Sequence, residues 1–265
     1  MSIESILNKM SEKQDSYELT IPVTWGQGRT AFGGISAAVC FQAAQNLIVD
    51  QRTPRSFHCN FIGPVTCGEP LKVTAEILRT GKNVTQIVAS VLQNDRVCVM
   101  AQICFGISRG SILHKPDTTK HALTVPKKGN FLPQIPKLVP KFIQHFELAV
   151  EKGSLSLGKS DDPVLHGWSK LKHPPAQMTY ACLIAVMDAW PPTMYQMKRI
   201  PAPASTMSWD VEFIAPIDDL NGEEWIASVN EARHIEDGYG HEESTFWAPD
   251  GRVLAYSRQV VAIFA

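Results

Sequence analysis

One short phrase occurs twice in this chain of 265 residues, and that repeat constrains the fold more than any other feature. Residues 55–65 read RSFHCNFIGPV, and residues 208–217 read SWDVEFIAPI. Each copy alternates between apolar and polar residues and ends in Phe-Ile, a small residue and Pro, which is typical of a strand that runs into a turn. Each copy also follows an apolar helical run. The repeat therefore predicts two copies of one unit, a helix cradled by an antiparallel sheet, which pack together as a pseudo-dimer.

The first unit begins with a helix. Gly33 and Gly34 precede a run with hardly a charge, ISAAVCFQAAQNLIV, which predicts a helix buried nearly all round. Strand-like runs follow, separated by the turn signals GE, GK and ND: SFHCNFI, PLKVTAEILRT, NVTQIVASVLQ and RVCVMAQICFG. One helix followed by long antiparallel strands indicates an α+β layer structure.

The second unit has the same order of elements. Residues 174–190, PPAQMTYACLIAVMDAW, predict a helix that Pro191 and Pro192 terminate. Alternating runs then predict four strands, within residues 205–217, 224–236, 238–249 and 252–265, and DGYGH at 237–241 has the composition of a hairpin turn.

Residues 109–164 differ from both units. They are rich in Pro and Lys and predict one short helix, at FIQHFELAVEK. We interpret this segment as a linker that runs along the surface, because it is longer than a typical loop. The predicted organisation is a first domain at 1–108, a linker at 109–164 and a second domain at 165–265.

Composition excludes several classes of partner. The net charge of −1 and a pI of about 6.7 provide no basic surface for nucleic acid or for an anionic membrane. The first residues are too polar for a secretory signal, and no apolar run approaches the ~18 residues of a membrane span, so we expect a cytoplasmic protein. The cysteines lie in apolar runs without CxxC or His spacing, which predicts reduced core thiols and no metal site.

Several segments, taken in order, resemble the acyl-CoA thioesterase II family, TesB-like proteins of the double-hotdog superfamily. They are WGQGRTAFGG, SFHCNFIGPVTCGEPL and LRTGKNVTQIVASVLQND, then HGWSKLKHPP, Asp188, STMSWDVEF and DGRVLAYSRQ. The resemblance spans most of the chain outside the linker. It implies an α+β double hotdog, in which one continuous antiparallel sheet wraps two central helices and the active site lies near the helix ends between the halves. It also implies an acyl-CoA thioesterase of fatty acid metabolism that forms a homodimer or higher homo-oligomer.

The resemblance assigns three catalytic residues. Asp188 matches the family Asp, Thr206 its Ser/Thr position and Gln259 its Gln position. Together they would bind one water, with Asp188 as the general base and the other two residues orienting the water. Each also has a simpler interpretation: Asp188 as a helix-end carboxylate that reaches solvent, Thr206 as an ordinary strand residue and Gln259 as a residue on a solvent-facing side of its strand.

Hydrolysis of a thioester also needs donors to the developing oxyanion. Backbone amides of Gly33 or Gly34 at a helix N-terminus could supply them, and the alternative is that these glycines only allow close helix packing. The chain contains no G-x-S-x-G elbow and no cysteine in an activating context, which favours direct attack by water over a covalent intermediate.

His58 is interpreted as a structural strand residue, because alternation turns its ring away from the face of Phe57 and Cys59. The chain departs from the family pattern at Ile35 and Ser36, where close relatives tend to carry a Gln. We therefore expect part of the pocket mouth to differ from that of the family, and the acyl specificity stays open.

Two other functions remain alternatives. A hotdog enoyl-CoA hydratase would carry an Asp-x-Asn-Pro-x-His motif, which is absent from this sequence. An acyl-CoA-binding protein without activity would need the apolar tunnel but not the three aligned polar residues. We expect no cofactor other than the CoA of the substrate, which scattered Lys and Arg side chains would bind.

Overall fold

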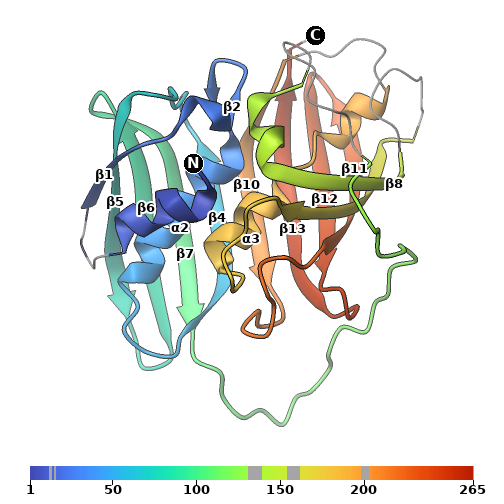
Figure 1. Ribbon diagram of the computed structural model, residues 1–265. Coiled ribbons are helices and arrows are strands. Elements are labelled where there is room, and N and C mark those ends of the chain that lie inside the picture. Colours follow the sequence, from blue (N-terminus) through green and yellow to red (C-terminus); the bar gives the residue numbers. More distant parts are fainter. Residues whose placement is uncertain (12–13, 15, 131–138, 154–161, 198–202, 265) are drawn as a thin grey trace.

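A computed structural model describes residues 1–11, 14, 16–130, 139–153, 162–197 and 203–264 (Figure 1). Its main element is a continuous antiparallel sheet of 11 strands. In order across the sheet these are β1 (Ser16–Thr20), β5 (Pro70–Thr80), β6 (Val84–Gln93), β7 (Arg96–Gly106), β4 (Thr53–Phe61), β10 (Ala204–Phe213), β13 (Val253–Ile263), β12 (Tyr239–Trp247), β11 (Ile226–Glu236), β9 (Val164–Leu171) and β8 (Phe146–Lys152).

The two halves of the sheet repeat one topology. The order β1-β5-β6-β7-β4 in the first half corresponds to β9-β11-β12-β13-β10 in the second, and β8 is added at the far edge. The repeated phrase forms β4 and β10, which pair with each other at the centre, Cys59 opposite Trp209. Each of these strands shifts register at the same place, between Pro54 and Ser56 and between Thr206 and Ser208. The predicted pair of units, the double hotdog, is confirmed.

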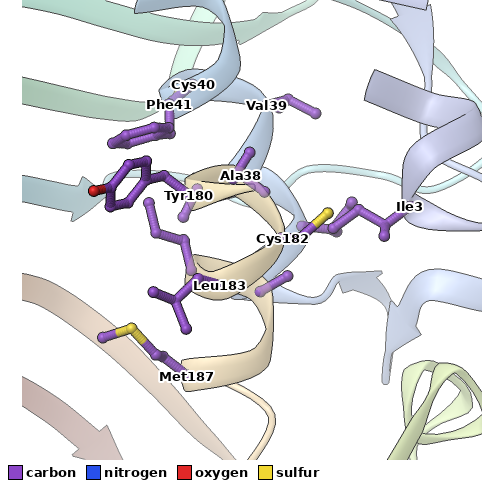
Figure 2. Close-up of a cluster of buried hydrophobic side chains, with 14 of the residues drawn as sticks. Ile3, Ala38, Val39, Cys40, Phe41, Tyr180, Cys182, Leu183 and Met187 are labelled. Carbon is purple, nitrogen blue, oxygen red and sulfur yellow. The ribbon is translucent and has the colours of Figure 1, made fainter. Parts of the chain in front are cut away.

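Two central helices lie against the sheet, α2 (Gly33–Asn46) and α3 (Tyr180–Met187). They run antiparallel to each other, since Phe41 of α2 lies 6.1 Å from the ring of Tyr180 at the start of α3, while Gly34 lies beside the end of α3. Figure 2 shows Phe41 and Tyr180 side by side, with Ile3 of the N-terminal helix α1 (Ile3–Leu7) near Cys182. Every residue of α3 is buried, which explains its uniformly apolar sequence.

Short elements complete the described chain. They are η1 (Asn8–Met10), η2 (Val23–Trp25), β2 (Gly26–Gln27), β3 (Thr30–Ala31), η3 (Lys141–His145) and η4 (Thr193–Met197). The described helices include none that is both long and apolar enough to cross a lipid bilayer.

The second central helix is shorter than its sequence predicted. It begins at Tyr180 instead of near Pro174, because the Thr179 hydroxyl caps it by accepting the Cys182 N–H at 3.2 Å. The preceding residues are held in an extended loop: the Gln177 side chain donates to the carbonyl of Leu220 at 2.8 Å. The helix ends at Met187, with Asp188 as its C-cap.

The helix predicted at 142–152 is wrong. Residues 141–145 form the 3₁₀ turn η3, and residues 146–152 form β8, which pairs with β9. Phe142 stacks on Phe32 at 4.0 Å and His145 stacks on Trp25 at 3.9 Å, so this part of the predicted linker packs on the first half. The linker residues 131–138 and 154–161 lie outside the described residues.

The turn signal ND forms a hairpin, and of the hairpin turn predicted at 237–241 only the first two residues form the turn, because residues 239–241 belong to β12. Asn94 and Asp95 connect β6 to β7 with φ of 52° and 59°, and Asp237 and Gly238 connect β11 to β12 with φ of 52° and 80°. Two consecutive left-handed residues form the turn whose twist matches that of paired strands.

Another stretch of the predicted linker covers the face of the second half that points away from α3. His121 packs edge-on against Trp168 and Trp247, with ring centroids 5.3 and 5.2 Å away. The Trp247 indole donates to the carbonyl of Thr119 at 3.0 Å, and the Leu123 N–H donates to His121 Nδ1 at 3.1 Å. The linker is therefore bound to the sheet here by a small aromatic cluster of its own.

This contact should make stability depend on pH. Burial lowers the pKa of His121 below its ordinary 6.5. A histidine whose pKa is lowered by folding contributes stability above its unfolded pKa, and the contribution is lost as the pH falls from 6.5 through the lowered folded pKa. His121→Phe should therefore remove part of the loss of unfolding free energy between pH 7 and pH 5, measured by urea denaturation. His114→Phe, at an exposed linker position, is the control; equal effects of the two substitutions would contradict the prediction.

Candidate functional site

Asp188 lies where the two central helices meet. As the C-cap of α3 it is half-buried, and the N-terminus of α2 faces it. Its carboxylate accepts hydrogen bonds from the Gln259 side chain, 3.0 Å from Nε2 to Oδ1, and from the Gly34 N–H. A helix N-terminus carries a partial positive charge, so α2 favours a carboxylate at this point. The neighbouring side chains and the α2 backbone hold Asp188 in place.

Thr206 and Gln259 extend this contact into a chain of hydrogen bonds. Gln259 lies on β13, the neighbour of β10, and Thr206 precedes the register shift in β10. The Thr206 hydroxyl donates to Gln259 Oε1 at 3.0 Å. The amide of Gln259 is therefore oriented from both sides, with its oxygen toward Thr206 and its nitrogen toward Asp188. The structure brings together all three residues that the family resemblance selected.

The environment of Asp188 makes it a much weaker acid than usual. Burial is the main cause that raises its pKa to about 7; the negative charge of Glu242 contributes to this rise, and the hydrogen bonds from Gln259 and Gly34 act in the opposite direction. A carboxylate that titrates near neutral pH can both accept and release a proton under ordinary conditions. Such a group can act as a general base.

The two glycines at the start of α2 have no room for a side chain. A Cβ atom at Gly33 would lie 2.9 Å from Asp188 Oδ2, and one at Gly34 would lie 2.6 Å from the Phe32 ring. Close packing, one of the two roles considered for these residues, is therefore shown. The Gly34 amide donates to Asp188, which places the helix N-terminus beside the carboxylate.

His58 lies away from the polar cluster formed by Asp188, Thr206 and Gln259, on the opposite face of the sheet. Its neighbours Phe57 and Cys59 are buried, whereas the His58 ring is exposed and its Nδ1 lies 2.6 Å from Asp210 Oδ1. The interpretation of His58 as a strand residue on the far face is confirmed.

Glu242, which the sequence did not single out, lies next to the cluster. It is on β12, directly opposite Gln259 of β13, and it is half-buried. Burial raises its pKa to about 7. In the sequence Glu242 stands in the polar run HEES and is indistinguishable from its neighbour Glu243; only the strand register shows that it faces the site.

The equivalent position in the first half carries apolar residues. Leu47 is the C-cap of α2, as Asp188 is of α3. Pro54 precedes the register shift of β4 as Thr206 precedes that of β10, and Ile103 faces Phe57 as Gln259 faces Trp209. Apolar residues thus occupy all three positions in the first half, and these residues provide no counterpart of the polar cluster formed by Asp188, Thr206 and Gln259.

Family models match both halves of the chain. The model described as the acyl-CoA thioesterase N-terminal domain matches residues 21–106, and the one described as the acyl-CoA thioesterase C-terminal domain matches residues 119–263. No curated protein sequence matches significantly.

Solved structures share the fold over the full length. A hot dog fold protein of Alicyclobacillus acidocaldarius is 22% identical with a TM-score of 0.85, each chain covered to 98%. The tesB protein of Mycobacterium avium subs paratuberculosis is 14% identical with a TM-score of 0.74, each chain covered to 100%. The acyl-CoA thioesterase II TesB2 of Mycobacterium marinum is 14% identical with a TM-score of 0.72, with 99% of this chain and 98% of that chain covered.

The two domain models together span the fold from η2 to β13 and include Asp188, Thr206 and Gln259. The chain thus belongs to the acyl-CoA thioesterase family, with the N-terminal and C-terminal domains of that family as its two hotdog units.

Proposed function

We propose that the chain hydrolyses an acyl-CoA thioester to a free acid and CoA, using a water molecule that Asp188, Thr206 and Gln259 bind. The observation that carries this proposal is the continuous hydrogen-bonded chain from Thr206 through Gln259 to Asp188, which ends in a carboxylate whose pKa is about 7. Membership of the acyl-CoA thioesterase family supports the substrate class.

In the proposed reaction Asp188 removes a proton from the bound water as the water oxygen attacks the thioester carbonyl carbon. The carbonyl oxygen becomes an oxyanion, and backbone amides at the N-terminus of α2 stabilise it. Because the Gly34 N–H faces Asp188, we assign the oxyanion contact to the amide of Gly33. The intermediate then breaks its C–S bond, and the CoA thiolate takes up the proton from Asp188. No acyl-enzyme forms.

Thr206 and Gln259 serve this reaction by position. An amide has no charge that would lower the pKa of the neighbouring carboxylate strongly, and it can hold a water beside it. Gln259 can do so only with one amide orientation, which the Thr206 hydroxyl imposes. CoA is part of the substrate, and no other cofactor is proposed. A place in fatty acid metabolism, a cytoplasmic location and a homo-oligomeric state complete the proposal.

Asp188→Asn should lower kcat by about a hundredfold or more, because a general base is lost. The measurement is thiol release from a panel of acyl-CoAs from acetyl to palmitoyl. Asp210→Asn, which changes an exposed carboxylate on the far face, should keep wild-type turnover. Full turnover by Asp188→Asn would remove this residue from the mechanism, whereas binding of acyl-CoA without turnover in the wild type would favour an acyl-CoA-binding protein.

The activity should also fall as the pH falls through about 7, because a base must be unprotonated to act. Stability should change in the opposite direction. A carboxyl group whose pKa is raised by folding contributes stability below its unfolded pKa, and that contribution is lost as the pH rises through 7. The unfolding free energy of Asp188→Asn minus that of the wild type should therefore increase between pH 5 and pH 8 in urea titrations. A constant difference would mean that Asp188 is ionised throughout this range.

Thr206→Val tests the orientation of the amide. Valine has a similar shape but cannot donate to Gln259, so we expect a loss of about tenfold in kcat with little change in thermal stability. Thr206→Ser, which restores the hydroxyl, should recover most of the rate. His58→Ala is the control on the far face and should affect stability more than turnover. A Val variant as active as the wild type would show that Gln259 needs no partner.

A further inference from the structure

Glu242 is placed by the sheet at the edge of the polar cluster. In antiparallel strands, two residues directly opposite each other point to the same face with their Cβ atoms about 5 Å apart. Glu242 is opposite Gln259, so its side chain points toward the same face as the amide that holds Asp188. Glu243 points to the other face, where it forms ion pairs with Arg233 and Arg258, both at 2.8 Å.

Glu242 also contacts the segment that leaves Asp188. Only four residues separate Asp188 from Thr193, where η4 begins. The Met194 N–H donates to Glu242 Oε1 at 3.4 Å, and the Thr193 N–H also faces the carboxylate. Two residues along the same face of β12, Gly240 leaves space for Met194, since a Cβ there would lie 1.8 Å from the Met194 Cε. Strand β12 thus contacts the start of η4 at two places: the Glu242 carboxylate accepts the Met194 N–H, and Gly240 leaves space for the Met194 side chain.

We propose that Glu242 is a positioning residue of the hydrolytic site: its carboxylate holds the start of η4 against β12, and its negative charge strengthens Asp188 as a base. The proposal deepens the function above and rests on it. No proton passes through Glu242. The proton goes from water to Asp188, and the nearby negative charge favours the protonated form of Asp188 that results.

The charges around the two carboxylates agree with this role. Glu242 raises the pKa of Asp188, and burial raises the pKa of Glu242 itself to about 7, so Glu242 carries its negative charge mainly above neutral pH. Among the residues that the structure describes, two further titratable side chains face the pair from other elements, Cys59 from β4 and Tyr195 from η4. Burial raises the pKa of both, so both are neutral near pH 7. Neither therefore adds a charge to the interaction between the two carboxylates.

Glu242→Gln provides the test, since glutamine keeps an acceptor for the Met194 N–H but removes the charge. The ¹³C resonance of the Asp188 side-chain carboxyl, assigned by comparison with Asp188→Asn, is titrated in the wild type and in Glu242→Gln. We expect the Asp188 titration to move to lower pH. The acidic limb of the kcat/KM profile should move with it, and the plateau should fall about three- to tenfold because Asp188 becomes a weaker base.

Two variants complete the design. Glu243→Gln removes a neighbouring charge on the far face and should leave the Asp188 titration unchanged. Glu242→Asp keeps the charge on a shorter side chain. The Asp188 carboxyl should therefore titrate nearer to its wild-type pH in Glu242→Asp than in Glu242→Gln. The shorter side chain should weaken the contact with η4 and so lower the thermal stability somewhat. An unchanged Asp188 titration in Glu242→Gln, or an equal shift in Glu243→Gln, would overturn the proposal. If the wild type hydrolysed no acyl-CoA, the proposed function would fail, yet the NMR titration would still decide whether Glu242 sets the basicity of Asp188.

Discussion

The contact between the end of α3 and the beginning of α2 organises the site of this protein. It requires two helices that run antiparallel inside one sheet, and it requires that one of them begins without side chains. Gly33 and Gly34 meet that condition, since a Cβ on either would collide with Asp188 or Phe32. The result is a carboxylate at one helix end, held by an amide at the other. The pairing of β4 with β10 makes this approach possible, because it joins the two halves of the sheet and so brings both helices against one continuous surface.

The two halves share a backbone but differ in chemistry. Leu47, Pro54 and Ile103 occupy the places that Asp188, Thr206 and Gln259 occupy in the second half. An unpaired carboxylate in a core is destabilising, whereas apolar side chains at the same depth are stabilising. A second polar cluster would therefore cost stability, and Leu47 and Ile103 contribute instead to the core of the first half. The two halves share one backbone fold, and the candidate site lies where their side chains differ.

The site brings together two carboxylates, Asp188 of the polar cluster and Glu242 beside it, whose pKa values both lie near 7. Burial of such ionisable groups destabilises the folded state at neutral pH. In this protein it occurs where α3, η4 and β12 meet. Perturbed carboxylates that gather at one place are a common property of catalytic sites, because a base must hold its proton neither too weakly nor too tightly. The far face of the same strands carries ordinary exposed pairs, such as His58 with Asp210.

The sequence by itself determined the features that depend on local patterns. Alternation and turn residues predicted four strands in each unit, β4 to β7 and β10 to β13, and the turns at ND and at DG, but not β1 and β9. The recurrence of Phe-Ile-small-Pro predicted the duplication, and family resemblance selected the three residues of the hydrogen-bonded chain. Alternation also placed His58 on the far face. Local patterns did not suffice where a partner decides the conformation: β8 has a helix-compatible sequence but pairs with β9, and α3 is shortened by its Thr179 cap and by the anchored Gln177. Glu242 and Glu243 are neighbours of the same type in the chain. Only the register of β12 against β13 turns one of them toward Asp188 and the other toward arginines in solvent, because contacts across a sheet join residues that are distant in sequence.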